Sequence, residues 1–348
     1  MDTYIIEARK TYNRIANLSK QKAKQNECIW CHKPITRFCN SHSVPQFVLK
    51  NIDWEGKVDY FNTIARIPLI NDDKGIAEAG TFKLLCNECD SKIFQNYENP
   101  DKLSLMPTER MMEEIALKNM LLYLSKRFFE IKLYETMEEQ YNASFPYEIK
   151  EEVNYLDLRD YLWDYHRIKE LIENENIEEK FKLIFWKKVQ YKVPIAFQGP
   201  ITIYGDLNGK LVEDIYDNSE EKIIKHAHVC VFPLEEESVI FAFYHGDDHE
   251  YDEFAKQIQG MQDEEILQAI GYIIFENSED MLLAKQIPHK TYFYNKVTEV
   301  FQDTTEIWAI SLADAERKKR KRRLGLRDNR ADFPKVLGER YAIKSLPV

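Results

Sequence analysis

Apolar side chains recur every three or four positions in four stretches of the chain, which is the spacing of one face of an α-helix. The first stretch covers residues 3–25, and the second follows Pro107. Thr108 is a candidate N-cap for the second helix, because its hydroxyl can accept a bond from a free backbone N–H of the first turn. The pattern predicts two more helices, over about residues 156–173 and 177–189. The helix after Pro107 has the broadest apolar stripe, so we expect it in the hydrophobic core.

Short apolar runs with alternating polar positions predict strands in two other parts of the chain. Residues 57–70 predict a pair of strands, and the composition changes again near Lys192. Later strands are expected over residues 195–197, 201–204, 211–215, 223–232 and 239–244. Asn208-Gly209 is a strong turn signal. A loop at 233–237 is expected to join the last two strands, and helices are expected near 250–275. Together these patterns predict an α+β fold with an antiparallel sheet in its C-terminal half.

The composition is that of a globular, acidic protein. The chain has 348 residues, of which 44% are hydrophobic, and this is enough for two or three domains. Its net charge of −11 argues against a general binder of polyanions, so any contact with nucleic acid must use local basic patches. The first ten residues lack the apolar segment of a signal peptide, and no apolar run reaches the ~18 residues of a membrane span. We therefore expect a soluble, cytoplasmic protein with no membrane partner.

Four of the six cysteines form two C-x2-C pairs. One pair is Cys28 and Cys31, and the other is Cys86 and Cys89. A two-residue gap lets one tight turn present both sulfurs to the same ion, and four thiolates suit tetrahedral Zn²⁺. In a long chain in a reducing compartment this spacing indicates metal ligands and not disulfides. The sequence therefore predicts one structural zinc site.

The segment between the two cysteine pairs carries a histidine motif. Residues 36–42 predict a short strand that ends at His42, and Pro45 follows three positions later. The second cysteine pair opens a predicted helix over residues 89–98. This order of C-x2-C, a strand with His-x-x-Pro, and Leu-Cys-x-x-Cys before a helix resembles the HNH endonucleases of the His-Me finger class. The resemblance covers about residues 26–100 and is to the zinc-stabilised branch, which has a treble-clef ββα core.

The resemblance assigns roles to individual residues. It implies that the four cysteines hold a structural zinc ion, that His42 is the general base that activates water, and that Asp90 binds a catalytic Mg²⁺ or Mn²⁺. Glu98 lies where some members carry a further acidic residue, so it is a candidate ligand of the same ion beside His42 and Asp90. These roles suit phosphodiester hydrolysis, which needs an activated water and a cation that offsets the charge on the phosphate. A neutral histidine with a pKa near its free value of ~6.5 can accept the proton.

Each of these residues also has a purely structural interpretation. His42 is then a hydrogen-bonded strand histidine, Asp90 a carboxylate favoured by a helix N-terminus, and Glu98 a solvated helix residue. Ser41 and Thr81 stand where the family usually has an acidic residue and the middle asparagine. These two differences favour an alternative function, a catalytically inactive zinc scaffold that binds nucleic acid or a protein partner.

A basic run near the C-terminus is a candidate nucleic-acid contact. It follows a predicted helix that contains Trp308 and Leu312, and it would bind backbone phosphates by releasing their counterions. The run consists of Arg317, Lys318, Lys319, Arg320, Lys321, Arg322 and Arg323. The alternative is a solvated tail, or a contact with the acidic body of the same protein.

Four histidines lie close together in the C-terminal half of the sequence. His226 and His228 alternate on a predicted strand and so face one side, while His245 and His249 follow the next strand. These are residue types that could form a second metal site, but exposed polar residues at strand ends are the favoured interpretation.

We divide the chain into four regions on these patterns. Residues 1–105 are expected to form an HNH-like zinc domain, 106–190 a helical region, 191–300 an α+β domain with the antiparallel sheet, and 301–348 a helix with the basic tail. The expected function is metal-dependent hydrolysis of DNA, with antiviral defence against foreign DNA as its setting by analogy. The residues do not separate DNA from RNA, and they leave a homo-oligomer or a partner protein open.

Overall fold

The computed structural model describes residues 2–35, 37–64, 67–141, 147–174, 181–278, 280–305 and 312–343. Its helices are α1 (Asp2–Lys22), α2 (Gln46–Leu49), α3 (Asn87–Ile93), α4 (Pro100–Leu103), α5 (Glu109–Tyr141), α6 (Tyr147–Glu173), α7 (Asp252–Gln259), α8 (Asp263–Asn277), α9 (Lys290–Thr305) and α10 (Leu312–Asp328), with short 3-10 turns η1 (His249–Tyr251) and η2 (Glu339–Tyr341). Its strands are β1 (Ser41–His42), β2 (Lys57–Ile64), β3 (Ile67–Gly75), β4 (Thr81–Phe82), β5 (Phe181–Val189), β6 (Ile195–Ile201), β7 (Ala227–Pro233), β8 (Ser238–His245) and β9 (Asp280–Leu283).

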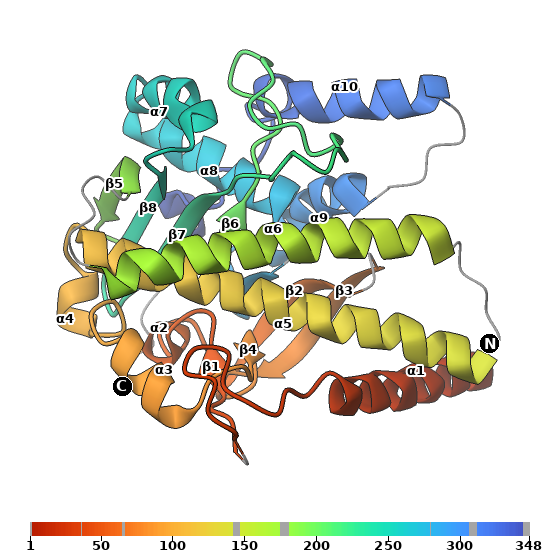
Figure 1. Cartoon of the computed structure of the whole chain (residues 1–348). Coiled ribbons are helices and arrows are strands. Elements are labelled where there is room, and N and C mark those ends of the chain that lie inside the picture. Colours follow the sequence, from red (N-terminus) through yellow and green to blue (C-terminus); the bar gives the residue numbers. More distant parts are fainter. Residues whose placement is uncertain are drawn as a thin grey trace.

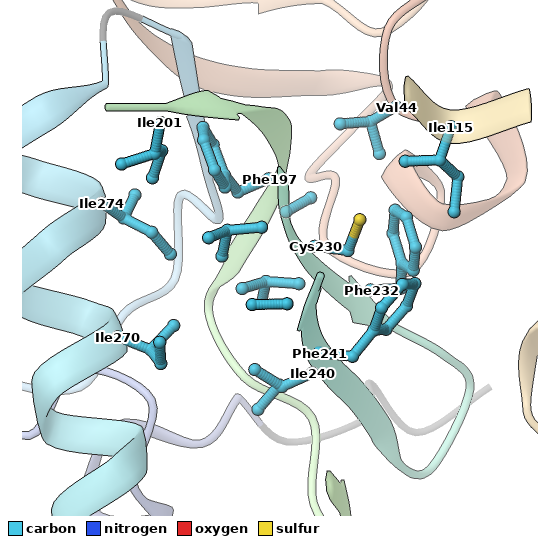
Figure 2. Close-up of a cluster of buried hydrophobic side chains, with 14 of the residues drawn as sticks. Val44, Ile115, Phe197, Ile201, Cys230, Phe232, Ile240, Phe241, Ile270 and Ile274 are labelled. Carbon is cyan, nitrogen blue, oxygen red and sulfur yellow. The ribbon is translucent and has the colours of Figure 1, made fainter. Parts of the chain in front are cut away.

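Seven of these strands form one antiparallel sheet in the order β3-β2-β9-β6-β7-β8-β5. The long helices α5 and α6 pack against each other on one face of the sheet, and α8 covers the other face (Figure 1). Ile270 and Ile274 of α8 face the sheet from one side, with Ile274 beside Phe197 of β6, whereas Ile115 of α5 lies on the opposite side near Phe232 (Figure 2). All five side chains are buried, and full burial of such a side chain contributes about 1.5–3 kcal/mol. The α+β class and its antiparallel sheet are confirmed.

The hairpin of β2 and β3 joins the N-terminal part of the chain to this sheet. β2 pairs with β9, which places Tyr60 opposite Leu282 and Phe61 opposite Met281. The strand pair expected over residues 57–70 is therefore present, and it extends the sheet of the C-terminal half. As a result, the segment with the cysteine pairs shares one continuous hydrophobic core with the rest of the described chain.

One of the predicted helices is a strand. The helix expected over residues 177–189 is wrong over 181–189, which form the edge strand β5 and pair with β8 along their whole length. Residues 177–180 lie outside the described residues. The register shifts between Leu183 and Phe185, and this irregularity hides the two-residue period by which a strand is recognised.

The segment between β6 and β7 is mostly a loop. Strands were expected over residues 201–204 and 211–215, but β6 ends at Ile201 and a single bridge joins Gly205 to Leu211. The turn predicted at Asn208-Gly209 is formed, and the side chain of Asp206 stabilises it by accepting the backbone N–H of Asn208 at 2.9 Å. Local bonds of this kind compete with strand pairing.

Several other expected elements are present, although of the strand expected over residues 36–42 only Ser41–His42 is formed, and residue 36 lies outside the described residues. Helices lie where the sequence predicts them over residues 3–25, after Pro107, and over 156–173, and the loop at 233–237 joins β7 to β8. The helices expected near 250–275 are α7 and α8. Among the helices of the described residues, none is both long and apolar enough to cross a membrane.

Candidate active site and metal centre

The four cysteines of the two C-x2-C pairs come together at the start of α3. Their sulfur atoms all lie within 4.8 Å of one another, and Cys31 Sγ lies 4.0 Å from Cys86 Sγ. Four sulfurs bound at about 2.3 Å to one zinc ion would be about 3.8 Å apart, so the cluster can hold zinc with little movement. Within the described residues, no other group of three or more histidine, cysteine or acidic side chains is as close. The predicted clustering of these cysteines is confirmed.

Local backbone bonds shape each half of this centre. The backbone N–H of His32 donates to the carbonyl of Cys28 at 2.8 Å, which closes the tight turn between the first two sulfurs. Cys86 is the N-cap of α3, and its sulfur accepts the N–H of Cys89 at 3.4 Å. The backbone N–H of Ile29 donates to the carbonyl of Leu84, which ties the first turn to the segment that leads into α3.

β1 and β4 place His42 beside this helix. The two strands pair antiparallel, with His42 opposite Thr81. Gly80 precedes β4 with a φ of 62°, and a Cβ there would approach Ser43 Oγ to 2.5 Å, so only glycine fits this close approach. The pairing of β1 with β4 therefore brings together two strands that are about forty residues apart in the sequence, and it places both beside the first cysteine pair and α3.

The ring of His42 is held by one hydrogen bond to the backbone. Its Nε2 lies 3.0 Å from the carbonyl oxygen of Ile76, at the end of the β2–β3 hairpin. A carbonyl only accepts, so Nε2 carries the proton and Nδ1 keeps a free lone pair. Burial and, secondarily, the nearby cation of Lys118 lower the pKa of His42 below 6.5, against opposing effects of the bond to Ile76 and of two carboxylates. The imidazole is therefore neutral at pH 7 and can accept a proton.

Asp90 lies one turn into α3 and is bound by Ser41 of β1 and by Cys39, two residues before that strand. Its Oδ1 accepts the hydroxyl of Ser41 at 2.6 Å, and its Oδ2 accepts the thiol of Cys39 at 3.3 Å. Burial and the Asp90 charge raise the pKa of Cys39 to about 11, so this thiol stays protonated and donates. Ser41, which stands where the HNH pattern usually has an acidic residue, thus positions Asp90.

Glu98 and Lys118 complete the cluster. α3 ends at Ile93, earlier than the helix expected over 89–98, and Glu98 lies in the turns that follow. Lys118 of α5 donates to Glu98 Oε1, and its Nζ also lies 3.7 Å from Asp90 Oδ1. The Asp90 and Glu98 side chains are 15% and 34% exposed, so the cluster is reachable from solvent, whereas the Lys118 side chain is 1% exposed.

Sequence reasoning missed Lys118. It lies twenty residues after Glu98, inside the apolar stripe of α5 between Leu117 and Met120, which are fully buried. A lysine in the middle of a core helix is a signal of a buried charge pair. Its partner, however, depends on the packing of α5 against the turn that follows α3.

Asp90 and Glu98 do not fit Mg²⁺ or Mn²⁺ in this arrangement. These ions need several oxygen ligands at about 2.0–2.2 Å in octahedral geometry. Both oxygens of Asp90 and Oε1 of Glu98 already accept bonds or face an ammonium. His42, Asp90 and Glu98 also do not form one of the close ligand groups of the described residues. The assignment of a catalytic ion to this site is therefore supported only by the family resemblance.

The basic run lies on α10, far from the cysteine cluster. In Figure 1, α10 is at the top of the molecule, while β1, β4 and α3 are at the bottom, beyond α5 and α6. Arg317, Arg320 and Lys321 are exposed along one face of α10, where they line a hollow of about 270 Å³. Arg317 also pairs with Asp314 at 2.6 Å. The helix expected around Trp308 lies outside the described residues, and α10 begins at Leu312.

The histidines of the C-terminal half are buried, so the expectation of exposed strand ends is wrong for three of them. His226, His228 and His245 are 7%, 4% and 5% exposed, and only His249 is exposed. They face α5 and α6 from the sheet. Burial lowers the pKa of His228 to about 3, so this ring is neutral. In the described chain these residues do not form a close metal-ligand group.

A hydrogen bond from α6 holds one of these histidines, His226, in its buried place. His226 Nδ1 lies 2.8 Å from Asp164 Oδ2. Arg167 donates to Asp164 at 2.7 Å and to both oxygens of Asp248, so one guanidinium joins α6 to the turn after β8. This polar cluster fixes α6 on the sheet.

No protein-family model, no curated protein and no solved structure matches this chain.

Proposed function

We propose that the chain is an HNH-like endonuclease that hydrolyses phosphodiester bonds in DNA. The observation that carries this proposal is the state of His42: its Nε2 is occupied by the Ile76 carbonyl, which leaves Nδ1 free, and the carboxylates of Asp90 and Glu98 are near enough to act on its pKa. A free, neutral Nδ1 is what a general base for water activation requires. The order of C-x2-C turn, β1, β4 and α3 around one cysteine cluster supports a treble-clef ββα core.

The zinc ion has a structural role in this proposal. β1 and β4 are two residues long each, so this unit has few backbone bonds of its own. Zinc on the four cysteines would hold the turn at Cys28 against the start of α3, and this would fix the distance between His42 and Asp90.

The chain's own residues carry the chemical steps. His42 Nδ1 accepts a proton from a water whose oxygen attacks the phosphorus. The P–O bond to the sugar oxygen breaks as the new P–O bond forms, and the departing oxygen takes its proton from solvent. The bond from Ile76 stabilises the imidazolium that forms, because a carbonyl oxygen facing Nε2–H favours the charged ring. No step is assigned to Mg²⁺ or Mn²⁺, since the carboxylates do not fit such an ion while Lys118 is paired with them.

The test is cleavage of plasmid DNA by the purified chain, with and without Mg²⁺ or Mn²⁺, compared with His42→Ala. Loss of a general base reduces the rate about 10²–10⁴-fold. His249→Ala is the matched control, because His249 is exposed on η1 and its ring bonds Asp252, outside the cysteine cluster. Zinc content is measured in all samples, so that loss of zinc is not mistaken for loss of the base. Equal cleavage by the parent and His42→Ala would refute the role of His42.

A second candidate function is a zinc scaffold that binds nucleic acid or a protein partner without cleavage. Thr81 favours it, because its hydroxyl donates to the carbonyl of Glu78 at 3.2 Å and supplies nothing to the site where the HNH pattern has asparagine. The exposed basic face of α10 would then be the contact for DNA or RNA. DNA binding with no cleavage by either the parent or His42→Ala would favour this function. Action against foreign DNA rests on the family resemblance alone.

A further inference from the structure

The most unusual feature of the candidate site is a cation that is already buried in it. Lysine is almost never as deeply buried as Lys118 unless it is paired. Its Nζ lies 3.8 Å from the centre of the Phe94 ring, binds Glu98 and faces Asp90. An ammonium therefore lies between the two carboxylates that the HNH resemblance assigns to a divalent ion.

We infer that Lys118 is an intramolecular competitor of the divalent cation, so that the resting site holds an ammonium at Asp90 and Glu98 in place of Mg²⁺ or Mn²⁺. This inference rests on the proposed function, since it concerns the same site. Like charges a few ångströms apart repel each other strongly where water is partly excluded. The ammonium and a divalent ion therefore do not share these oxygens, and the ion binds only when Lys118 withdraws.

The fold holds Lys118 in place from both sides. One turn earlier on the same face of α5, Glu114 accepts the backbone N–H groups of Asn96 at 3.0 Å and Tyr97 at 3.1 Å, next to Glu98. On the adjacent face, Asn119 Nδ2 lies 3.1 Å from His228 Nδ1 of the sheet. Withdrawal of Lys118 therefore requires a movement of α5 or of the turn at 96–98, and this couples metal affinity to the position of α5.

The experiment is a titration of the zinc-loaded full chain with Mn²⁺, followed by electron paramagnetic resonance. The parent is compared with Lys118→Met, which keeps the length of the side chain and removes the charge, and with Lys118→Arg, which keeps the charge. We expect weak binding by the parent and by Lys118→Arg, and binding of one Mn²⁺ at least about tenfold tighter by Lys118→Met. Adding Asp90→Asn to Lys118→Met should abolish the gain. Equal affinities of the parent and Lys118→Met would overturn the inference.

A second measurement decides the matter if Lys118→Met does not fold. Asp90→Asn is then introduced into the parent alone. Weak Mn²⁺ binding that Asp90→Asn leaves unchanged supports the inference, whereas tight binding that Asp90→Asn abolishes overturns it. Neither measurement uses DNA cleavage, so a chain that cleaves nothing refutes the proposed function and still answers the question about Lys118.

Discussion

Glu114→Gln is expected to destabilise the turn that presents Glu98 to the candidate site. Glu114 is fully buried on α5 and accepts four hydrogen bonds. Oε2 accepts two backbone N–H groups, and Oε1 accepts Asn96 Nδ2 at 2.6 Å and Arg110 Nε at 3.2 Å. Glutamine is the same size, but an NH₂ group replaces one of the two carboxylate oxygens. Each oxygen of Glu114 accepts two donors, so in either orientation of the amide two of the four donors face the NH₂ group and lose their acceptor.

The expected loss in the free energy of unfolding follows from those two lost hydrogen bonds. A donor left without an acceptor in a buried place costs about 1–3 kcal/mol. The Arg110 side chain is 38% exposed and can turn to water, so the amide is expected to point its NH₂ group there and the cost of that donor is at the low end. The sum is about 2–4 kcal/mol in the free energy of unfolding. With a denaturant slope of about 3 kcal/mol per M, the urea midpoint falls by about 1 M.

The assay is urea unfolding followed by circular dichroism, with hydrogen exchange of the amides of Asn96 and Tyr97. Both amides should exchange faster in Glu114→Gln, because they bind the carboxylate directly. Glu88→Gln is the control, since Glu88 makes an exposed pair with Lys92 and should leave the midpoint unchanged. A midpoint and exchange rates equal to those of the parent would refute the reasoning.

Three further predictions concern other parts of the molecule. Bonds from His226 and Arg167 hold the pKa of Asp164 below its usual 3.8 despite burial. The stability that the Asp164 carboxylate contributes is therefore present above pH 3.8 and is lost as the pH falls through the pKa of the folded state. Urea midpoints of Asp164→Asn should depend less on pH below 4 than those of the parent. Cys86→Ser should lower the zinc content and the melting temperature together, and a melting temperature that stays the same when zinc is lost would contradict a structural role. Replacing Arg317, Arg320 and Lys321 by alanine should reduce the slope of log affinity for DNA against log salt by up to about 2.7, and an unchanged slope would exclude α10 as the contact.

The part of the site that local spacing determines was predictable from the sequence. A C-x2-C spacing closes a turn by itself, so the clustering of Cys28, Cys31, Cys86 and Cys89 required only that both turns meet. The helix of residues 109–141 was likewise evident from its apolar stripe. These features depend on neighbours a few positions apart.

The parts that depend on tertiary packing were not predictable. Lys118 meets Glu98 only because α5 packs against the turn after α3, and His42 takes its backbone partner from an insert that reaches the main sheet. The burial of His226 follows from Asp164, sixty-two residues earlier in the chain. For residues 181–189, pairing with β8 across a register shift outweighed an ambiguous local pattern.

The most direct test of the account is rescue of His42→Ala by free imidazole in single-turnover cleavage of DNA, with equal zinc in both proteins. The account expects cleavage by the parent, a loss of about 10²-fold or more in the variant, and partial recovery when imidazole replaces the missing base. Cleavage by His42→Ala at the parental rate without imidazole would contradict the assignment of His42 as the general base.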